Sequence, residues 1–329
     1  MDRSRRALEL DAARPRISRV LRYDASMSVQ SPILAIAANV PDSVIRGAPE
    51  RAREVRALID EHDLRFVLDN RPGFVFVARQ RKGVNEVAAS IQGLELLWSL
   101  SFAHYVLYAL TNEARQRGES HADFSANTRA ISAAALLEWA VDRAAGRVAS
   151  GWPPHLPQPD ETNGEVSDEA VATELYLCST AWVFQHELAH HSLGHVGRAD
   201  ARLDDERNAD AAATAWLLDA VPEDPRVRIK RGLGIVIALI ALNVLDLYSV
   251  PPEEAGRTRS HPKAAERIVD ALDHPAFADN DQVLDFAVVT LSAHLQRLGI
   301  DVPQEPHDTL RGDLASLCIA ASRLQQRLP

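Results

Sequence analysis

Residues 183–191 read Val-Phe-Gln-His-Glu-Leu-Ala-His-His and contain the pattern His-Glu-x-x-His. In a helix, residues four apart lie on the same face, one turn above each other. His186 and His190 can therefore direct two imidazole nitrogens at one metal ion, and Glu187 beside them can take a proton from the attacking water. This arrangement of ligands and base predicts a zinc-dependent peptidase.

The residues around this pattern predict a long helix. Ser167 or Asp168 can cap its start, and acidic residues in the first turn suit the positive end of the helix dipole. No proline or glycine follows until Gly194, and apolar residues recur at roughly helical spacing: Val171, Leu175, Cys178, Trp182 and Leu188. The histidines therefore fall near the C-terminal end of a helix. The alternative is an amphipathic helix with solvated histidines, because histidine is enriched here.

A catalytic zinc site needs a third protein ligand and leaves one position open for water. The metzincin pattern would place a histidine six residues after His190 and a glycine three after it. Those positions are Val196 and Leu193, so the sequence excludes this pattern. The stretch from Glu206 to Asp210 instead reads Glu-Arg-Asn-Ala-Asp, the Glu-x-x-Ala-Asp form of many gluzincins. On a second helix, Glu206 can ligate the zinc and Asp210 can hold the far N–H of a liganding histidine. The alternative is acidic residues that only decorate a helix start.

A third segment, residues 260–268, reads Ser-His-Pro-Lys-Ala-Ala-Glu-Arg-Ile. Pro262 suits the first turn of a helix. His261 could point back at the metal and donate a hydrogen bond to the oxyanion that forms when water attacks a carbonyl. An ordinary helix-capping segment explains these residues equally well, so both interpretations stay open.

The composition is that of a globular protein, with 329 residues of which 46% are hydrophobic and 25% charged. The net charge of −10 argues against a nucleic-acid partner. Two cysteines, Cys178 and Cys318, build no disulfide framework and fit a reducing cytosol. The N-terminus has no apolar signal-peptide core. The apolar run at 232–245, about 14 residues, is short for a membrane span and predicts a buried helix. We therefore expect a cytoplasmic protein without a membrane span.

The order of segments predicts a fold that is mainly α with a small β-sheet (α+β), built as a zincin-like core with helical N- and C-terminal elaborations. Strands are expected at 65–68 and 74–78 as a hairpin around Arg71-Pro72-Gly73. Helices are expected at 50–61, 86–117, 128–145, 282–298 and 308–327. We expect an arginine-rich, disordered extension (1–26), an α+β part (27–150), a Pro-rich connection (151–167) and a zinc-binding helical catalytic part (168–329). Residues 27–329 could also form one domain.

The chain resembles the Lit family of phage-exclusion peptidases from about Ser31 to its C-terminus. The metal motifs are shared with many zincins, whereas the tryptophan-bearing segments are specific to this family. The segments that carry the resemblance include Arg71-Pro72-Gly73-Phe74, Gly93-Leu94-Glu95-Leu96-Leu97-Trp98, Leu136-Leu137-Glu138-Trp139-Ala140, Trp152-Pro153, Ala181-Trp182, Ala213-Thr214-x-Trp216 and His261-Pro262-x-Ala264-x-Glu266-Arg267-Ile268.

The resemblance implies a cytosolic zinc endopeptidase that cleaves translation elongation factor Tu when a phage coat-protein peptide is present, which stops translation in the infected cell. In this interpretation one Zn²⁺ per chain is held by His186, His190 and Glu206. Glu187 is the base and His261 an oxyanion donor. The alternatives are a zincin with a different protein substrate, a zinc-bound sensor without catalysis, and a membrane-associated protease supported only by the run at 232–245.

Overall fold

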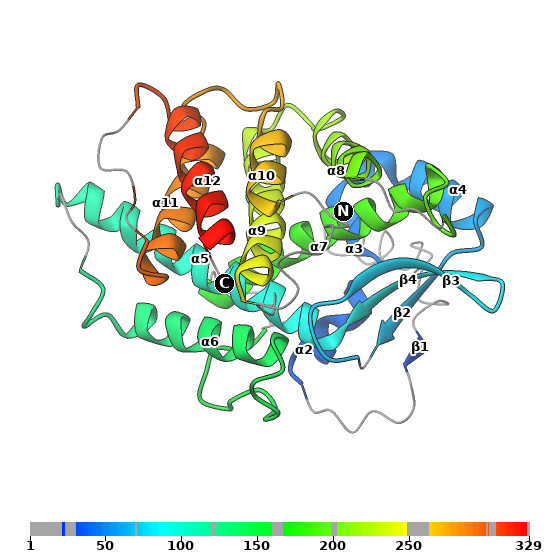
Figure 1. Ribbon diagram of the computed structural model, residues 1–329, viewed down its shortest axis with the longest axis horizontal. Coiled ribbons are helices and arrows are strands. Elements are labelled where there is room, and N and C mark those ends of the chain that lie inside the picture. Colours follow the sequence, from blue (N-terminus) through cyan, green and yellow to red (C-terminus); the bar gives the residue numbers. More distant parts are fainter. Residues whose placement is uncertain are drawn as a thin grey trace, which may run out of the picture.

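The computed structural model describes residues 22–23, 31–69, 71–119, 123–159, 167–198, 203–248, 263–300, 302 and 307–327. Figure 1 shows a small sheet on one side, helices α9 to α12 on the other, and α7 running between them. The mainly helical α+β fold predicted from the sequence is thus confirmed. The helices are α2 (Ile33–Ile36), α3 (Ser43–Gly47), α4 (Ala52–Glu61), α5 (Ile91–Gln116), α6 (Thr128–Ala144), α7 (Asp168–Ser192), α8 (Leu203–Leu218), α9 (Pro225–Tyr248), α10 (Ala264–Leu272), α11 (Gln282–Arg297) and α12 (Leu310–Arg327), with 3-10 turns η2 (Ala37–Asn39) and η3 (Pro49–Arg51).

The sheet has the order β1-β2-β4-β3, with strands β1 (Arg22–Tyr23), β2 (Arg65–Asp69), β3 (Phe76–Arg81) and β4 (Val84–Ser90). The hairpin predicted between 65–68 and 74–78 is wrong, because β2 and β3 do not pair with each other. Both pair with β4, β2 in parallel and β3 antiparallel. The real hairpin turns at Lys82 and Gly83, which both have positive φ, 52° and 78°. Such a backbone matches a tight two-residue hairpin turn.

The strand β4 was expected to be the start of a helix at residue 86. The helix α5 instead begins at Ile91, after Ser90 accepts a hydrogen bond from the Gly93 N–H as its N-cap. Residues 84–90 adopt an extended conformation because they form the strand that pairs with both β2 and β3 in the sheet. Pairing within a sheet therefore overrides the helical pattern of this segment.

Helix α7 lies at the centre of the fold, in contact with α3, α5, α8, α9, β3 and β4. Two buried tryptophans tie it to its neighbours through hydrogen bonds of 3.0 Å. Trp182 donates to Thr214 on α8, and Trp98 of α5 donates to Thr173 on α7. Because α7 is held on several sides, its C-terminal turns have a fixed position relative to α8 and the sheet.

The apolar run at 232–245 lies on α9, where residues 235–241 are almost completely buried against α7 and other helices. This confirms the buried helix predicted from its length. None of the helices in the described ranges is long and apolar enough to cross a membrane.

One cluster of buried apolar side chains extends from Ile33 to Ala321. The Pro-rich connection joins this core through Trp152, whose ring packs against Trp98 and Trp139; its residues 160–166 lie outside the described residues. Of the predicted extension 1–26, only Arg22–Tyr23 are described, and they pair with β2 as β1.

Candidate metal centre

Helix α7 places the predicted ligands at its C-terminal end. Ser167 caps the start by accepting a hydrogen bond from the Ala170 N–H, with Asp168 and Glu169 in the first turn. The helix then runs without interruption to Ser192, so His186 and His190 stand one turn apart on one face. The long helix predicted around His-Glu-x-x-His is therefore present.

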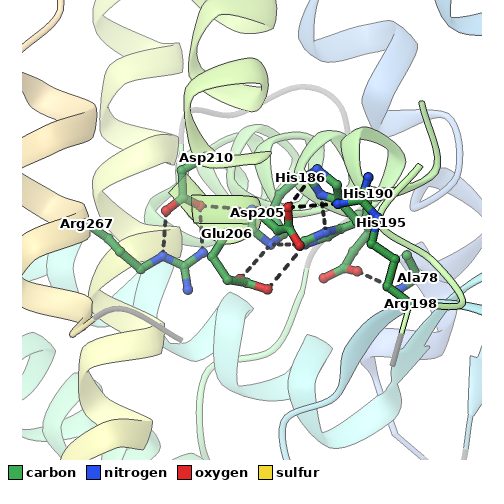
Figure 2. A network of polar contacts seen from close by, with 10 residues as sticks. Ala78, His186, His190, His195, Arg198, Asp205, Glu206, Asp210 and Arg267 are labelled. Atoms are coloured by element: carbon green, nitrogen blue, oxygen red, sulfur yellow. Dashed lines mark hydrogen bonds and ion pairs between the residues drawn. The ribbon is translucent and has the colours of Figure 1, made fainter. Parts of the chain in front are cut away.

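The ligand atoms of His186, His190 and Glu206 converge, and all lie within 4.8 Å of one another. The Nε2 atoms of the two histidines are 3.1 Å apart. Glu206 reaches over from α8, with Oε2 3.4 Å from His186 Nε2 and Oε1 3.5 Å from His190 Nε2 (Figure 2). The side chains of His186 and Glu206 are 7% and 9% exposed. Two imidazoles and one carboxylate are the donor set of many catalytic zinc sites.

The surroundings of His186 favour a positive charge at this place. Burial lowers its pKa, but contacts with Asp210 and Glu206 raise it by more, to about 9 in the absence of metal. The carboxylates thus create a negative potential around the two Nε2 atoms. A bound divalent cation would satisfy that potential, so the residues present fit a metal ion.

Asp210 lies behind His186, on the side away from the converging nitrogens. Its Oδ1 is 2.9 Å from His186 Nδ1. Arg267, from α10, donates two hydrogen bonds to the same carboxylate, Nε to Oδ2 at 2.7 Å and Nη2 to Oδ1 at 2.6 Å. Asp210 and Arg267 are both buried, so the charge pair is shielded from water. The structure brings Asp210 to the place expected of a residue that orients a ligand.

Glu187 is buried on the opposite side, beside the sheet. The Ala78 N–H of β3 donates a hydrogen bond of 2.5 Å to Glu187 Oε2. Burial raises the pKa of the Glu187 carboxyl above its ordinary value, against the lowering effects of His186 and of the Ala78 N–H. Because the Ala78 N–H donates to Glu187, this N–H points away from β4 and lies on the outer edge of the hairpin formed by β3 and β4.

Three contacts around His190 extend the site beyond the predicted residues. The Nδ1 atom of His190 is 3.1 Å from Nδ1 of His195. On its other side, His195 Nε2 lies 3.4 Å from Oδ1 of Asp205, which Arg198 Nη1 approaches to 3.3 Å. Figure 2 shows His190, His195, Asp205 and Arg198 together beside the ligand cluster.

The sequence predicted the three residues that converge but not the contacts of Arg267, His195 and Asp205. Arg267 lies in the segment 260–268, which was considered because of His261. No local pattern in that segment indicates that the Arg267 side chain reaches α8. The sequence signal for Asp205 was its position directly before Glu206. Because successive residues of a helix point in different directions, Asp205 contacts a different side chain of the site. His261 lies outside the described residues, so its role as oxyanion donor stays a prediction.

Comparison with known proteins identifies a peptidase family. A family model described as peptidase U49 matches residues 87–287, a region that includes α7 and α8. The chain is similar to the cell death peptidase of Escherichia coli strain K12, with 25% identity over 291 residues that cover 87% of this chain and 97% of that protein. No solved structure matches the chain. The two matches confirm the Lit-like resemblance, and because the family model covers more than half of its length, the chain belongs to the peptidase U49 family.

Proposed function

We propose that this peptidase is a zinc endopeptidase of the cytoplasm. The observation that carries the proposal is the convergence of His186, His190 and Glu206 within 4.8 Å, with a buried glutamate next to the first histidine. A structural metal site is closed by four ligands and needs no base. Three ligands and Glu187 therefore favour a catalytic site over a zinc-bound sensor.

The three ligands would hold one zinc ion, which supplies Lewis acidity toward the scissile carbonyl oxygen and toward water. Glu187 accepts the proton of the attacking water and delivers it to the leaving amine. Burial raises the pKa of the Glu187 carboxyl, which makes its carboxylate a stronger base. No side chain forms a covalent bond with the substrate in this scheme.

Strand β3 is the proposed support for an extended substrate. Among the described strands it pairs only with β4, so its second edge is not covered by another described strand. The Ala78 N–H on that edge contacts the proposed base. A peptide that adds to the edge of β3 would run past Glu187 and the converging ligands, because strand addition uses backbone groups of this kind.

The proposed substrate is translation elongation factor Tu, and the proposed trigger is a phage-derived peptide. The Lit-like resemblance supports both, and the similarity to a cell death peptidase extends over 97% of that relative. Cleavage of an abundant translation factor kills the cell, so the resting enzyme must be nearly silent. A trigger that completes the substrate site meets this requirement.

The test compares new protein N-termini in cells that express the wild-type chain or Glu187→Gln, before and after infection by a restricted phage. We expect one new N-terminus within elongation factor Tu, only in infected wild-type cells. If the factor stays whole while another protein is cut, the substrate is wrong but the peptidase stands. If the two strains give the same N-termini, the peptidase mechanism is wrong.

In vitro, we expect Glu187→Gln to keep its zinc and its fold while cleavage slows by about two orders of magnitude or more, because the amide cannot accept the proton. Comparable cleavage by the variant would remove Glu187 from the mechanism. Zinc content and melting temperature, measured beside the cleavage rate, separate lost chemistry from lost structure.

A further inference from the structure

His195 reaches His190 because of the way α7 ends. The Gly194 N–H donates to the carbonyl of His191 at 3.1 Å, and the His195 N–H donates to the carbonyl of His190 at 2.8 Å. With Gly194 in the left-handed region at φ 67°, these bonds form a Schellman motif. The motif folds the third residue after the helix back onto the last turn. Here those two positions carry His195 and His190, so the helix end itself brings the two imidazoles together.

Helix α8 contributes to both sides of this contact. Glu206 joins the ligand cluster, and the preceding residue, Asp205, lies 3.4 Å from His195 Nε2. The side chains of His195 and Asp205 are 8% and 13% exposed, which is low for polar groups at a helix end. Arg198 contacts Asp205 from the outer side. A solvated cluster would not be shielded to this extent.

The direction of each hydrogen bond follows from a metal on His190 Nε2. Such a metal leaves the proton of a neutral imidazole on Nδ1, so His190 donates to Nδ1 of His195. His195 then carries its own proton on Nε2 and donates it to Asp205. Asp205 Oδ1 lies within reach of both His195 Nε2 and Arg198 Nη1, so the donors and acceptors of the row have consistent roles.

We propose that His195 and Asp205 are positioning residues that hold His190 in the tautomer and orientation required for metal binding. This inference rests on the proposed zinc site. In this arrangement each liganding histidine is held by a carboxylate. Asp210 contacts His186 directly, whereas Asp205 acts on His190 through His195. Each carboxylate also contacts an arginine, Arg267 or Arg198.

The test measures the zinc dissociation constant of the full chain by competition with a chelator at fixed pH. We expect His195→Ala to weaken zinc binding about 10–100-fold, as removal of outer-shell partners typically does. His195→Asn, whose Oδ1 can take the place of the accepting Nδ1, should recover part of the loss. The control is His274→Ala, which removes another histidine–aspartate pair, His274 Nε2 to Asp219 Oδ1 at 3.1 Å, outside the ligand cluster. It should leave zinc affinity unchanged.

A zinc affinity of His195→Ala within about twofold of wild type would overturn the proposal. If the wild-type chain itself binds no zinc, the proposed function fails instead, so the two failures are distinguishable. If His195→Ala does not fold, the proposal is tested by ¹⁵N-histidine NMR of the zinc-loaded wild type and of the zinc-loaded Asp205→Asn variant. In the wild type, His190 must carry its proton on Nδ1 and His195 on Nε2. In Asp205→Asn the His195 signals should shift. Any other tautomer pair in the wild type contradicts the row of bonds.

Discussion

At the scale of single residues, the local pattern of the sequence predicted the candidate metal ligands but not the residues that contact them. His186, His190 and Glu206 follow from spacing along two helices, because a helix fixes the face on which residues four apart lie. Arg267 could not be found in this way. It comes from α10, 57 residues beyond Asp210, and only the packing of α8 against α10 brings the two together.

The pair of Asp210 and Arg267 gives a prediction about stability. Arg267→Met leaves a buried carboxylate without its bidentate partner, and breaking a buried ion pair in this way costs about 3–5 kcal/mol. We expect the free energy of unfolding, measured with urea, to fall by that order, and zinc affinity to fall with it because Asp210 contacts His186.

The matched control is Arg226→Met, which breaks an arginine–aspartate pair of 2.8 Å whose arginine is 88% exposed. We expect little change there, since water screens the exposed pair. Equal effects of the two substitutions on stability would mean that Asp210 does not depend on Arg267.

At the scale of elements, the sequence predicted the helices more reliably than the sheet. Helix α7 was predicted from its cap, its apolar spacing and its terminal glycine, all of which are local signals. The strand β4 was not predicted, because its extended form depends on pairing with β2 and β3. The strand β2 is distant in the sequence, and the Lys82-Gly83 turn that joins β3 to β4 was not recognised. The hydrogen bond between the edge of β3 and Glu187 therefore emerged only from the structure.

The contact between α7 and α8 can be tested through Trp182 and Thr214. Thr214→Val keeps the shape of the side chain but leaves the buried indole N–H without its acceptor, which costs about 1–3 kcal/mol. Because this bond joins the helix that carries the histidines to the helix that carries Glu206, we expect zinc affinity to fall as well.

The control uses the same chemistry elsewhere, since Trp98 donates to Thr173 at the same distance between α5 and α7. Thr173→Val should lower the free energy of unfolding to a similar extent and leave zinc affinity unchanged. A parallel loss of zinc affinity in both variants would show that the effect reflects general destabilisation rather than the link between α7 and α8.

At the scale of the whole molecule, the continuous apolar core agrees with the mainly helical fold expected from the sequence. Two histidines are buried in this core away from the metal centre. Burial lowers the pKa of His104 to about 3, with a further contribution from His294, and lowers the pKa of His294 to about 4, with a further contribution from Arg297. No local pattern in the sequence indicates their burial, because burial of a histidine depends on how helices pack.

These two histidines predict sensitivity to acid. Their pKa values in the folded state lie below the ordinary value of 6.5, so the unfolded state binds protons more readily. The contribution of these two histidines to stability is therefore full above pH 6.5. It falls as the pH drops toward about 4, by up to about 1.4 kcal/mol per pH unit for each histidine. We expect His104→Phe to reduce the slope of unfolding free energy against pH over this range. An unchanged slope would mean that His104 is not neutral in the folded protein.

The central claim is that His186, His190 and Glu206 hold one zinc ion, and the most direct measurement is the metal content of purified protein. We predict close to one zinc per chain for the wild type and for the surface control His274→Ala. The His186→Ala/His190→Ala double variant should contain almost none, because it keeps a single carboxylate ligand. Stoichiometric zinc in the double variant, or none in the wild type after expression with zinc, would contradict the account.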